Sequence, residues 1–525
     1  MQLVSYRFLF FILVFLAVYY VVPRRAQWMA LLAASCVFYA CGGAGGLLYL
    51  FCTVLSTWAL ALWIGRMTRQ GNAFVKERGL SGAEKRAYNA AVKKRQRALM
   101  LAGVVLNFGI LAVLKYTNFI LGNVNAALSG AGYEFPYVDW LLPLGISYYT
   151  FQSMGYLIDV YHRKYEPERN PFRFALFASF FPQMTQGPVS RFDELSGQLF
   201  AGRRFEWSTV RMGLVRILWG YFKKLAAADR IAPVVAAISG NPAEYQGAYV
   251  WAGMLLYTLM MYGDFTGGID IALGVAELFG VKLPENFDRP FLSRSLSEFW
   301  RRWHMSLMRW FREYIFFPVS TSRASRKCSD WMRRLFGKGA GRRAPLYLAS
   351  IVVWFITGIW HGASWNFVSW GLANCAVLLI SQELSPVYKR FRKRFAWTDS
   401  GAYRAFETAR TFILFSMLEM FEYYPFPVVF SMFGSMFLGL SSGRLTDGRL
   451  MEMGLCAGDW LVFGLSVLLM AAVGLAGRKT GIRAWLFQRP AWARFLLIYG
   501  LFLAVLVFGA YGQGYDASQF IYNQF

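Results

Sequence analysis

The sequence predicts an all-α, polytopic integral membrane protein, and two observations support that fold class. Of the 525 residues, 57% are apolar and only 16% are charged, whereas soluble domains average about 45–50% apolar and about 25% charged residues. Stretches nearly free of charge recur along the chain, and a helix needs about 20 such residues to cross a bilayer core. We therefore expect roughly ten to thirteen transmembrane helices, with re-entrant and interfacial helices, in one polytopic domain over residues 1–525.

The charge balance agrees with this fold class. Lys and Arg number 55 against 29 Asp and Glu, which gives a net charge of +26. The basic residues stand in short clusters between apolar stretches, a pattern typical of the cytoplasmic loops of membrane proteins. Because they do not decorate a polar, folded surface, we expect no binding to nucleic acid.

The first third of the chain sets the orientation. Apolar stretches at residues 8–23, 27–41 and 47–64 precede a polar segment, 66–97, that holds ten basic residues and two glutamates. Positive charge favours the cytoplasmic side. Three crossings before this segment then place the N-terminus outside the cell. The next spans, 98–121 and 140–161, are joined by the acidic loop 122–139, which we expect outside.

The middle of the chain is less regular. Residues 174–188 are apolar but short, and they contain Pro182, Gly187 and Pro188. A re-entrant element fits this stretch better than a full crossing, because irregular backbone at membrane depth must be surrounded by protein or water. We divide the domain into N-terminal spans (1–139), a central core (140–382) and C-terminal spans (383–525). Further apolar stretches occur at 212–222, 231–238, 248–262, 412–440, 460–476 and 495–511.

His361 is the first candidate for chemistry. It lies near the middle of an uncharged stretch, residues 345–382, with basic clusters at both ends. The stretch therefore predicts a helical hairpin that enters and leaves the membrane from the cytoplasm. At about 1.5 Å per residue, His361 would lie roughly 22 Å along the first helix. Ionisable groups at such depth are costly and are functional candidates; the alternative is a neutral histidine that donates to a carbonyl at a helix break.

His304 is the second candidate. Read as one helix, residues 297–314 have an aromatic face and a cationic face, which suits an interface or the wall of a funnel. His304 falls at the margin of the aromatic face. The pattern leaves an interfacial and a catalytic histidine equally open. Arginines here, such as Arg301, could bind a phosphate or form a solvated face.

A glycine-rich segment with carboxylates, residues 262–270, is the third candidate. Its glycines permit an unwound segment, and Asp264 could line a cavity there. A packing break is the open alternative. No motif of metal-ligand spacing occurs in the sequence, so we expect no metal site.

Five segments together resemble the membrane-bound O-acyltransferase family, in particular its bacterial branch of alginate O-acetyltransferases and the teichoic-acid D-alanyl transfer protein. The matching segments are residues 143–152, 180–191, 264–267, 299–307 and 360–362. The resemblance implies a ring of tilted helices around a central funnel or tunnel. It also implies that His361 is the catalytic histidine and His304 the second histidine of the pair. We expect seven further residues to line the tunnel or position substrate: Trp303, Trp360, Asn366, Asp264, Arg301, Gln183 and Ser147.

The resemblance implies transfer of an acyl group, most simply acetyl, from a cytoplasmic thioester to hydroxyls of an extracytoplasmic polysaccharide or cell-wall polymer. A neutral imidazole can serve as the general base. The donor would be acetyl-CoA or the phosphopantetheine of an acidic acyl carrier protein, and we expect no permanently bound cofactor. The protein would reside in the bacterial cytoplasmic membrane, in contact with the lipid bilayer.

The departures from the family pattern bear on the acceptor. Two further spans after about residue 455 favour the polysaccharide O-acetyltransferase type. Residues 319–323, however, read Val-Ser-Thr-Ser-Arg where Gly-Gly-Asn-Arg often occurs, which leaves the acceptor polymer open.

Three alternatives stay open at this point. The first is D-alanyl transfer from a carrier protein to teichoic acid. The second is a transporter or flippase in which Asp264 is the moving part. The third is a relay that passes acyl groups to a separate extracytoplasmic acyltransferase. The acyl group, the acceptor and the oligomeric state are not given by the sequence.

Overall fold

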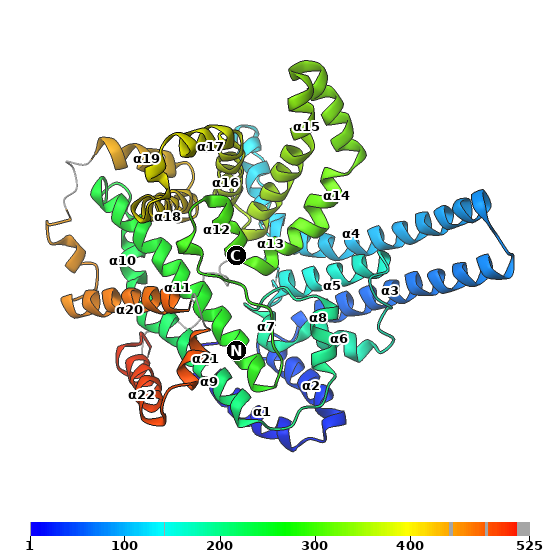
Figure 1. Cartoon of the computed structure of the whole chain (residues 1–525), viewed down its shortest axis with the longest axis horizontal. Helices are drawn as coiled ribbons and strands as arrows, with labels where there is room; N and C mark the ends of the chain where they lie inside the picture. Colours follow the sequence, from blue (N-terminus) through cyan, green and yellow to red (C-terminus); the bar gives the residue numbers. More distant parts are fainter. Residues whose placement is uncertain (1, 141, 440–444, 478–480, 512–525) are drawn as a thin grey trace. The chain divides into compact units, whose positions relative to one another are not determined.

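The computed structural model describes residues 2–140, 142–439, 445–477 and 481–511 (Figure 1). Every regular element in these ranges is helical, so the predicted all-α class is confirmed. The chain forms two compact units, Met1–Gly213 with Ala272–Pro284, and Leu214–Ile271 with Glu285–Phe525. Two helices, α9 (Trp207–Tyr221) and α11 (Ala248–Leu278), contribute residues to both units.

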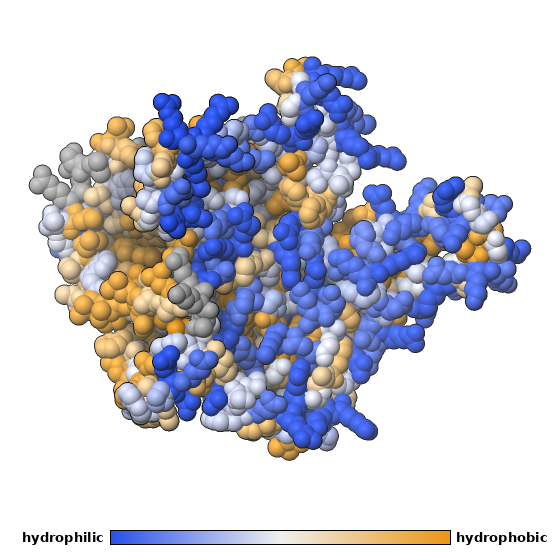
Figure 2. Space-filling view, in the orientation of Figure 1, coloured by the Kyte–Doolittle hydropathy of each residue, from blue (hydrophilic) through white to orange (hydrophobic). Residues whose placement is uncertain are grey.

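The first unit is a set of helices around the paired α3 and α4. Its helices are α1 (Tyr6–Val21), η1 (Arg24–Ala26), α2 (Gln27–Ala40), α3 (Gly46–Glu77), α4 (Gly82–Leu128), η2 (Ser129–Ala131), α5 (Ile146–Tyr161), α6 (Pro171–Ser179), α7 (Phe181–Met184) and α8 (Phe192–Leu199). The basic segment 66–97 continues α3 and begins α4 as a long helical hairpin. Figure 2 shows hydrophilic side chains over the far ends of these two helices.

The segment 174–188 is broken, because α6 ends at Ser179 and α7 covers only Phe181–Met184. The Asn170 side chain caps α6 by accepting from the Phe172 amide, at 2.9 Å. The ring of Phe181 packs against a cluster of Phe11, Phe15, Phe38 and Phe279. That the segment 174–188 re-enters a membrane stays a prediction.

The second unit holds the remaining helices. They are η3 (Phe222–Ala228, π-helical), α10 (Asp229–Gly240), η4 (Pro290–Leu292), α12 (Leu296–Arg302), α13 (Met305–Phe311), η5 (Arg312–Phe316, π-helical), α14 (Phe317–Ser320), α15 (Arg323–His361), α16 (Trp365–Glu383), α17 (Ser385–Arg394), η6 (Ala396–Asp399), α18 (Gly401–Tyr423), α19 (Val428–Leu438), η7 (Arg449–Met451), α20 (Ala457–Ala476), α21 (Ile482–Phe487) and α22 (Ala491–Phe508). A large apolar cluster joins α10, α11, α18, α19 and α20.

Five of the described helices are long and apolar enough to cross a membrane, or six if the bent pair α16 and α17 is one span. Two shorter apolar helices, α1 and α19, accompany them. The ten to thirteen predicted crossings therefore have to include shorter or more polar helices, such as α5 and α11. Figure 2 shows hydrophobic surface over α20, where Leu461, Leu465 and Leu468 are exposed, as expected for a helix that faces lipid.

Candidate active site

His361 is the last residue of α15, at the break between α15 and α16. Gly362 follows in an extended conformation, with φ −167° and ψ 154°. The two helices approach closely at glycines: a Cβ on Gly358 would lie 2.4 Å from the Phe367 carbonyl oxygen, and a Cβ on Gly371 would lie 2.4 Å from that of Trp354. The helix–turn–helix that the uncharged stretch predicts is therefore present. Its close packing fixes the position of His361.

The imidazole of His361 lies in a buried aromatic and acidic environment. Its side chain is 11% exposed. The ring centroid is 4.5 Å from that of Trp370 and 5.1 Å from that of Trp360. Nδ1 of His361 is 3.3 Å from Oε1 of Glu422, whose side chain is 3% exposed. A carboxylate at this distance favours a proton on Nδ1.

His304 stands at a second helix break, between α12 and α13, with φ 46° and ψ 48°. The interpretation of residues 297–314 as one continuous helix is wrong at this point. Asn286 causes the break: its carbonyl oxygen accepts from the Met305 amide at 2.9 Å, and its side-chain Oδ1 accepts from the Ser306 amide and hydroxyl at 3.0 and 2.9 Å. A left-handed backbone is uncommon for a residue other than glycine, and such strain clusters at functional sites.

The two histidines share neighbours. The ring centroid of His304 is 5.0 Å from that of Phe265 and 6.0 Å from that of Trp360, so Trp360 is adjacent to both imidazoles. His304 is 2% exposed and lies outside the candidate membrane spans. Burial lowers its pKa well below the ordinary value, and the nearby His361 adds to the shift. His304 is therefore neutral at neutral pH.

This neutral histidine predicts a pH-dependent stability. In the unfolded chain His304 binds a proton near pH 6.5, whereas in the folded protein it stays neutral. The unfolded state then binds more protons, so stability falls as the pH falls below about 6.5, by up to about 1.4 kcal/mol per pH unit. Unfolding in mixed micelles between pH 5 and 8 measures this slope. His304→Gln should have a shallower slope, and equal slopes in the two proteins would contradict the prediction.

Similarity to known proteins is found over the region that holds both histidines. The sequence model of the MBOAT, membrane-bound O-acyltransferase family, matches residues 168–418. A probable alginate O-acetylase of Azotobacter vinelandii is 34% identical over 72% of this chain and 68% of its own length. The chain belongs to the membrane-bound O-acyltransferase family.

Two other relatives are more distant. A peptidoglycan O-acetyltransferase of Helicobacter pylori is 29% identical over 58% of this chain and 59% of its own length. A teichoic acid D-alanyltransferase of Bacillus subtilis is 27% identical over 49% of this chain and 62% of its own length. Across five probable alginate O-acetylases, the match covers 63% to 70% of their length. Together with the long apolar helices, the family makes this chain a multi-pass membrane protein and an O-acyltransferase.

Three of the predicted positioning residues occupy different environments in this acyltransferase. Trp303 is buried and stacks on Phe299, with ring centroids 5.4 Å apart. Asn366 donates to the carbonyl oxygens of Phe421 and Tyr424, at 3.1 and 2.5 Å. It thereby links the start of α16 to the end of α18. Arg301 is exposed and donates to the Ser297 hydroxyl, at 3.1 Å. Their contact with substrate stays a prediction.

Asp264 lies in a continuous helix, since α11 runs from Ala248 to Leu278 without interruption. The unwound segment that its glycines would permit is therefore absent from this helix. The carboxylate of Asp264 accepts from Nζ of Lys224 at 2.5 Å, and Asp229 accepts from the same Nζ at 2.6 Å. This ion pairing holds η3 and α11 together. A role of Asp264 toward substrate stays a prediction.

Gln183 and Ser147 belong to the first unit. Gln183 is buried at the end of α7, and its Oε1 accepts from the Ser190 hydroxyl at 3.0 Å. Ser147 is half-buried in the first turn of α5. The two histidines, Trp303, Trp360, Asn366, Asp264 and Arg301 all belong to the second unit.

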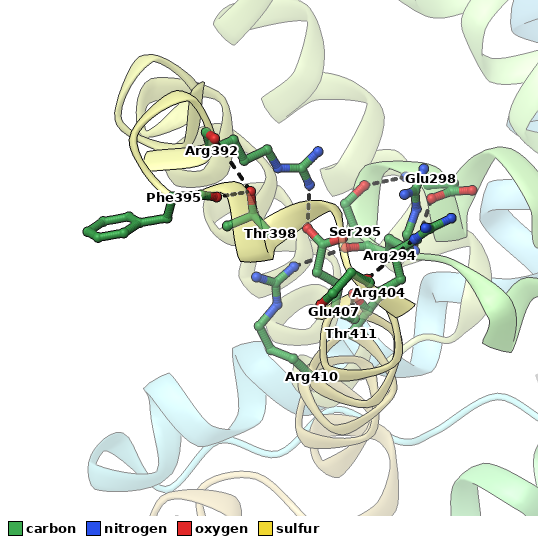
Figure 3. Close-up of polar contacts among 11 residues, drawn as sticks. Arg294, Ser295, Glu298, Arg392, Phe395, Thr398, Arg404, Glu407, Arg410 and Thr411 are labelled. Carbon is green, nitrogen blue, oxygen red and sulfur yellow. Dashed lines mark hydrogen bonds and ion pairs between the residues drawn. The ribbon is translucent and has the colours of Figure 1, made fainter. Parts of the chain in front are cut away.

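Helix α12, which ends near His304, is anchored to α18 at its other end (Figure 3). The carbonyl oxygen of Arg294 accepts from Nη2 of Arg410 at 3.0 Å. The hydroxyl of Ser295 caps α12 by accepting from the Glu298 amide at 3.2 Å. On the same helix α18, Glu407 is paired with Arg392 (Figure 3). The helix that carries Glu422 therefore also holds the helix that leads to His304.

Four residues around the histidines were not anticipated from the sequence: Asn286, Trp370, Glu419 and Glu422. A signal for the glutamates is present, because they are two carboxylates three residues apart in the apolar stretch 412–440. Asn286 carries no such signal, since it lies in an irregular segment. As for metals, the described part of the chain holds no group of three or more His, Cys, Asp or Glu side chains that could bind an ion.

Proposed function

We propose that this acyltransferase transfers acetyl groups from a cytoplasmic thioester to hydroxyls of an extracytoplasmic polysaccharide, in the bacterial cytoplasmic membrane, with its N-terminus outside. The observation that carries the proposal is the site itself: the imidazole of His361, 11% exposed, lies beside a carboxylate and near a second, buried histidine. The acceptor class is supported by relatives named as alginate O-acetylases, which reach 35% identity over 72% of this chain. The orientation rests on the basic segment 66–97.

The residues of the site suit a direct transfer. Nε2 of His361 takes the proton of the acceptor hydroxyl while the oxygen forms its bond to the thioester carbonyl carbon. The carbon–sulfur bond then breaks, and the leaving thiolate receives the proton back from the imidazolium. The thioester is a substrate, so the reaction consumes no resident cofactor. Aromatic rings from Trp360 and Trp370 surround the imidazole and limit the access of water, which would hydrolyse the thioester.

An anionic donor fits the exposed arginines at α12 and in the first half of α18. Arg294, Arg301, Arg404 and Arg410 are all exposed. Guanidinium groups bind phosphate well because of their planar, bidentate geometry. Acetyl-CoA carries phosphates, and an acyl carrier protein carries phosphopantetheine on an acidic surface. This cationic surface favours either donor over a neutral one.

Reconstitution tests the proposal. The full chain in lipid vesicles receives ¹⁴C-acetyl-CoA on one side and alginate, peptidoglycan fragments or teichoic acid on the other. We expect alkali-labile label on alginate or on the peptidoglycan fragments, the two polysaccharides among these acceptors. Label that stops on an added extracytoplasmic acyltransferase, with none on polymer, would favour the relay. Transfer of D-alanine from a loaded carrier protein to teichoic acid, without acetyl transfer to either polysaccharide, would contradict the proposed acyl group and acceptor.

A further inference from the structure

Two buried glutamates stand behind His361, on one face of α18. Glu419 and Glu422 are three residues apart, which is about one helical turn. Glu419 is 1% exposed, and the side chain of Glu422 is 3% exposed. Oε1 of Glu422 is 3.3 Å from Nδ1 of His361, and its Oε2 accepts from the Tyr257 hydroxyl at 3.3 Å. The contact between Nδ1 and Oε1 is at ion-pair distance and is longer than an ordinary hydrogen bond.

Glu419 adds an unusual feature to this environment. It is buried one helical turn before Glu422, and its Oε1 accepts from Nε1 of Trp370 at 3.0 Å. Two carboxyl groups one turn apart in a buried site are costly to ionise together. A proton on Glu419 would leave the single negative charge on Glu422. The position nearest His361, Glu422, is where that charge is best placed.

Contacts from α16 fix the positions of His361 and the two glutamates relative to one another. The ring of Trp370 packs against that of His361, with centroids 4.5 Å apart and planes tilted by 42°, while its indole nitrogen donates to Glu419. Asn366, one turn before Trp370 on α16, donates to the carbonyl oxygens of Phe421 and Tyr424, on either side of Glu422. A single helix, α16, thus fixes both the imidazole and the two glutamates.

We propose that Glu422 is a positioning residue of the acyl transfer, which accepts the Nδ1 proton of His361 and so leaves Nε2 unprotonated toward the reactants, while Glu419 holds the proton that the two carboxyls share. This inference rests on the proposed function of His361. During transfer Nε2 gains the acceptor proton, and the Glu422 carboxylate stabilises the imidazolium without itself becoming protonated. The proton returns from Nε2 to the leaving thiolate, so Glu422 begins and ends the cycle ionised.

Because the chain has few histidines, the tautomer of His361 can be determined by NMR spectroscopy. The chain has three, so ¹⁵N-histidine labelling of the full protein gives two ring nitrogens for each, and His361→Gln identifies the signals of His361. In the wild type we expect His361 to be protonated on Nδ1. In Glu422→Gln and Glu422→Met the share of His361 protonated on Nδ1 should fall, most in the methionine variant, whose thioether is only a weak acceptor.

Kinetics supply the second readout. We expect kcat per folded protein to fall by about 10²–10⁴-fold in both Glu422 variants, as when the carboxylate behind a catalytic histidine is neutralised, with KM for the thioester changed less than about threefold. Glu407→Gln is the matched control: it removes a buried carboxylate of the same helix that pairs with Arg392 (Figure 3), and it should retain kcat. A loss of kcat with an unchanged tautomer, or an unchanged kcat, would overturn the proposal. If the wild type transfers nothing, the proposed function fails, while the tautomer still decides whether Glu422 orients His361.

Discussion

His361→Ala should abolish acyl transfer almost completely, with a loss of about 10²–10⁴-fold from the general base alone. The purified variant should remain folded, because the substitution removes a side chain at the end of α15 and leaves the glycine contacts between α15 and α16 in place. The measurement is the rate of label transfer from thioester to polymer, normalised to monodisperse protein. A rate equal to that of the wild type would rule out His361 as the base.

The chain supplies its own controls for this experiment. His162→Ala changes an exposed histidine at the end of α5 and should transfer at the wild-type rate. His304→Ala should also lose activity, but its fold has to be checked, since His304 occupies a strained backbone position. A transporter or flippase would continue to move its cargo in vesicles after loss of His361, so vesicle transport by the variant separates that alternative from an acyltransferase.

The sequence was sufficient to predict the fold class, because a charge costs much inside a bilayer and uncharged stretches therefore indicate spans. The same physics makes His361, an ionisable residue inside such a stretch, a candidate for function. The break at His304 could not be predicted in this way. It depends on Asn286, which is 18 residues earlier in the sequence and replaces helical hydrogen bonds with bonds of its own.

The acidic residues beside His361 could not be predicted from the sequence, because they are distant from it along the chain. Glu422 follows His361 by 61 positions, and only the packing of α16 against α18 places the two side chains together. The same is true of Asp264, for which the sequence left a site wall and a packing break open. Its partner Lys224 lies 40 positions earlier, in a π-helical turn that no periodicity in the sequence indicates.

Among the substitutions considered, we expect the loss of Lys224 from its ion pairs to lower the free energy of unfolding most. The Lys224 side chain is 1% exposed, and its Nζ lies between the carboxylates of Asp229 and Asp264, which are themselves 10% and 5% exposed. Lys224→Met would keep the volume of the side chain but leave two buried carboxylates without their cation. Removal of one partner from a buried ion pair costs about 3–5 kcal/mol. We therefore expect the free energy of unfolding, measured by SDS titration in mixed micelles, to fall by that amount.

The loss of the Lys224 charge beside Asp229 and Asp264, rather than the loss of lysine packing, should cause this destabilisation. Replacing the two aspartates with neutral residues tests that cause. Adding Asp264→Asn and Asp229→Asn to Lys224→Met should recover most of the lost stability, because buried ion groups can be replaced by neutral ones at little net cost. Lys389→Met, which removes an exposed lysine of α17, should change the free energy of unfolding by less than about 0.5 kcal/mol. If Lys224→Met behaves like Lys389→Met, the two carboxylates must be solvated or protonated in the folded protein, and the ion pair does not hold η3 to α11.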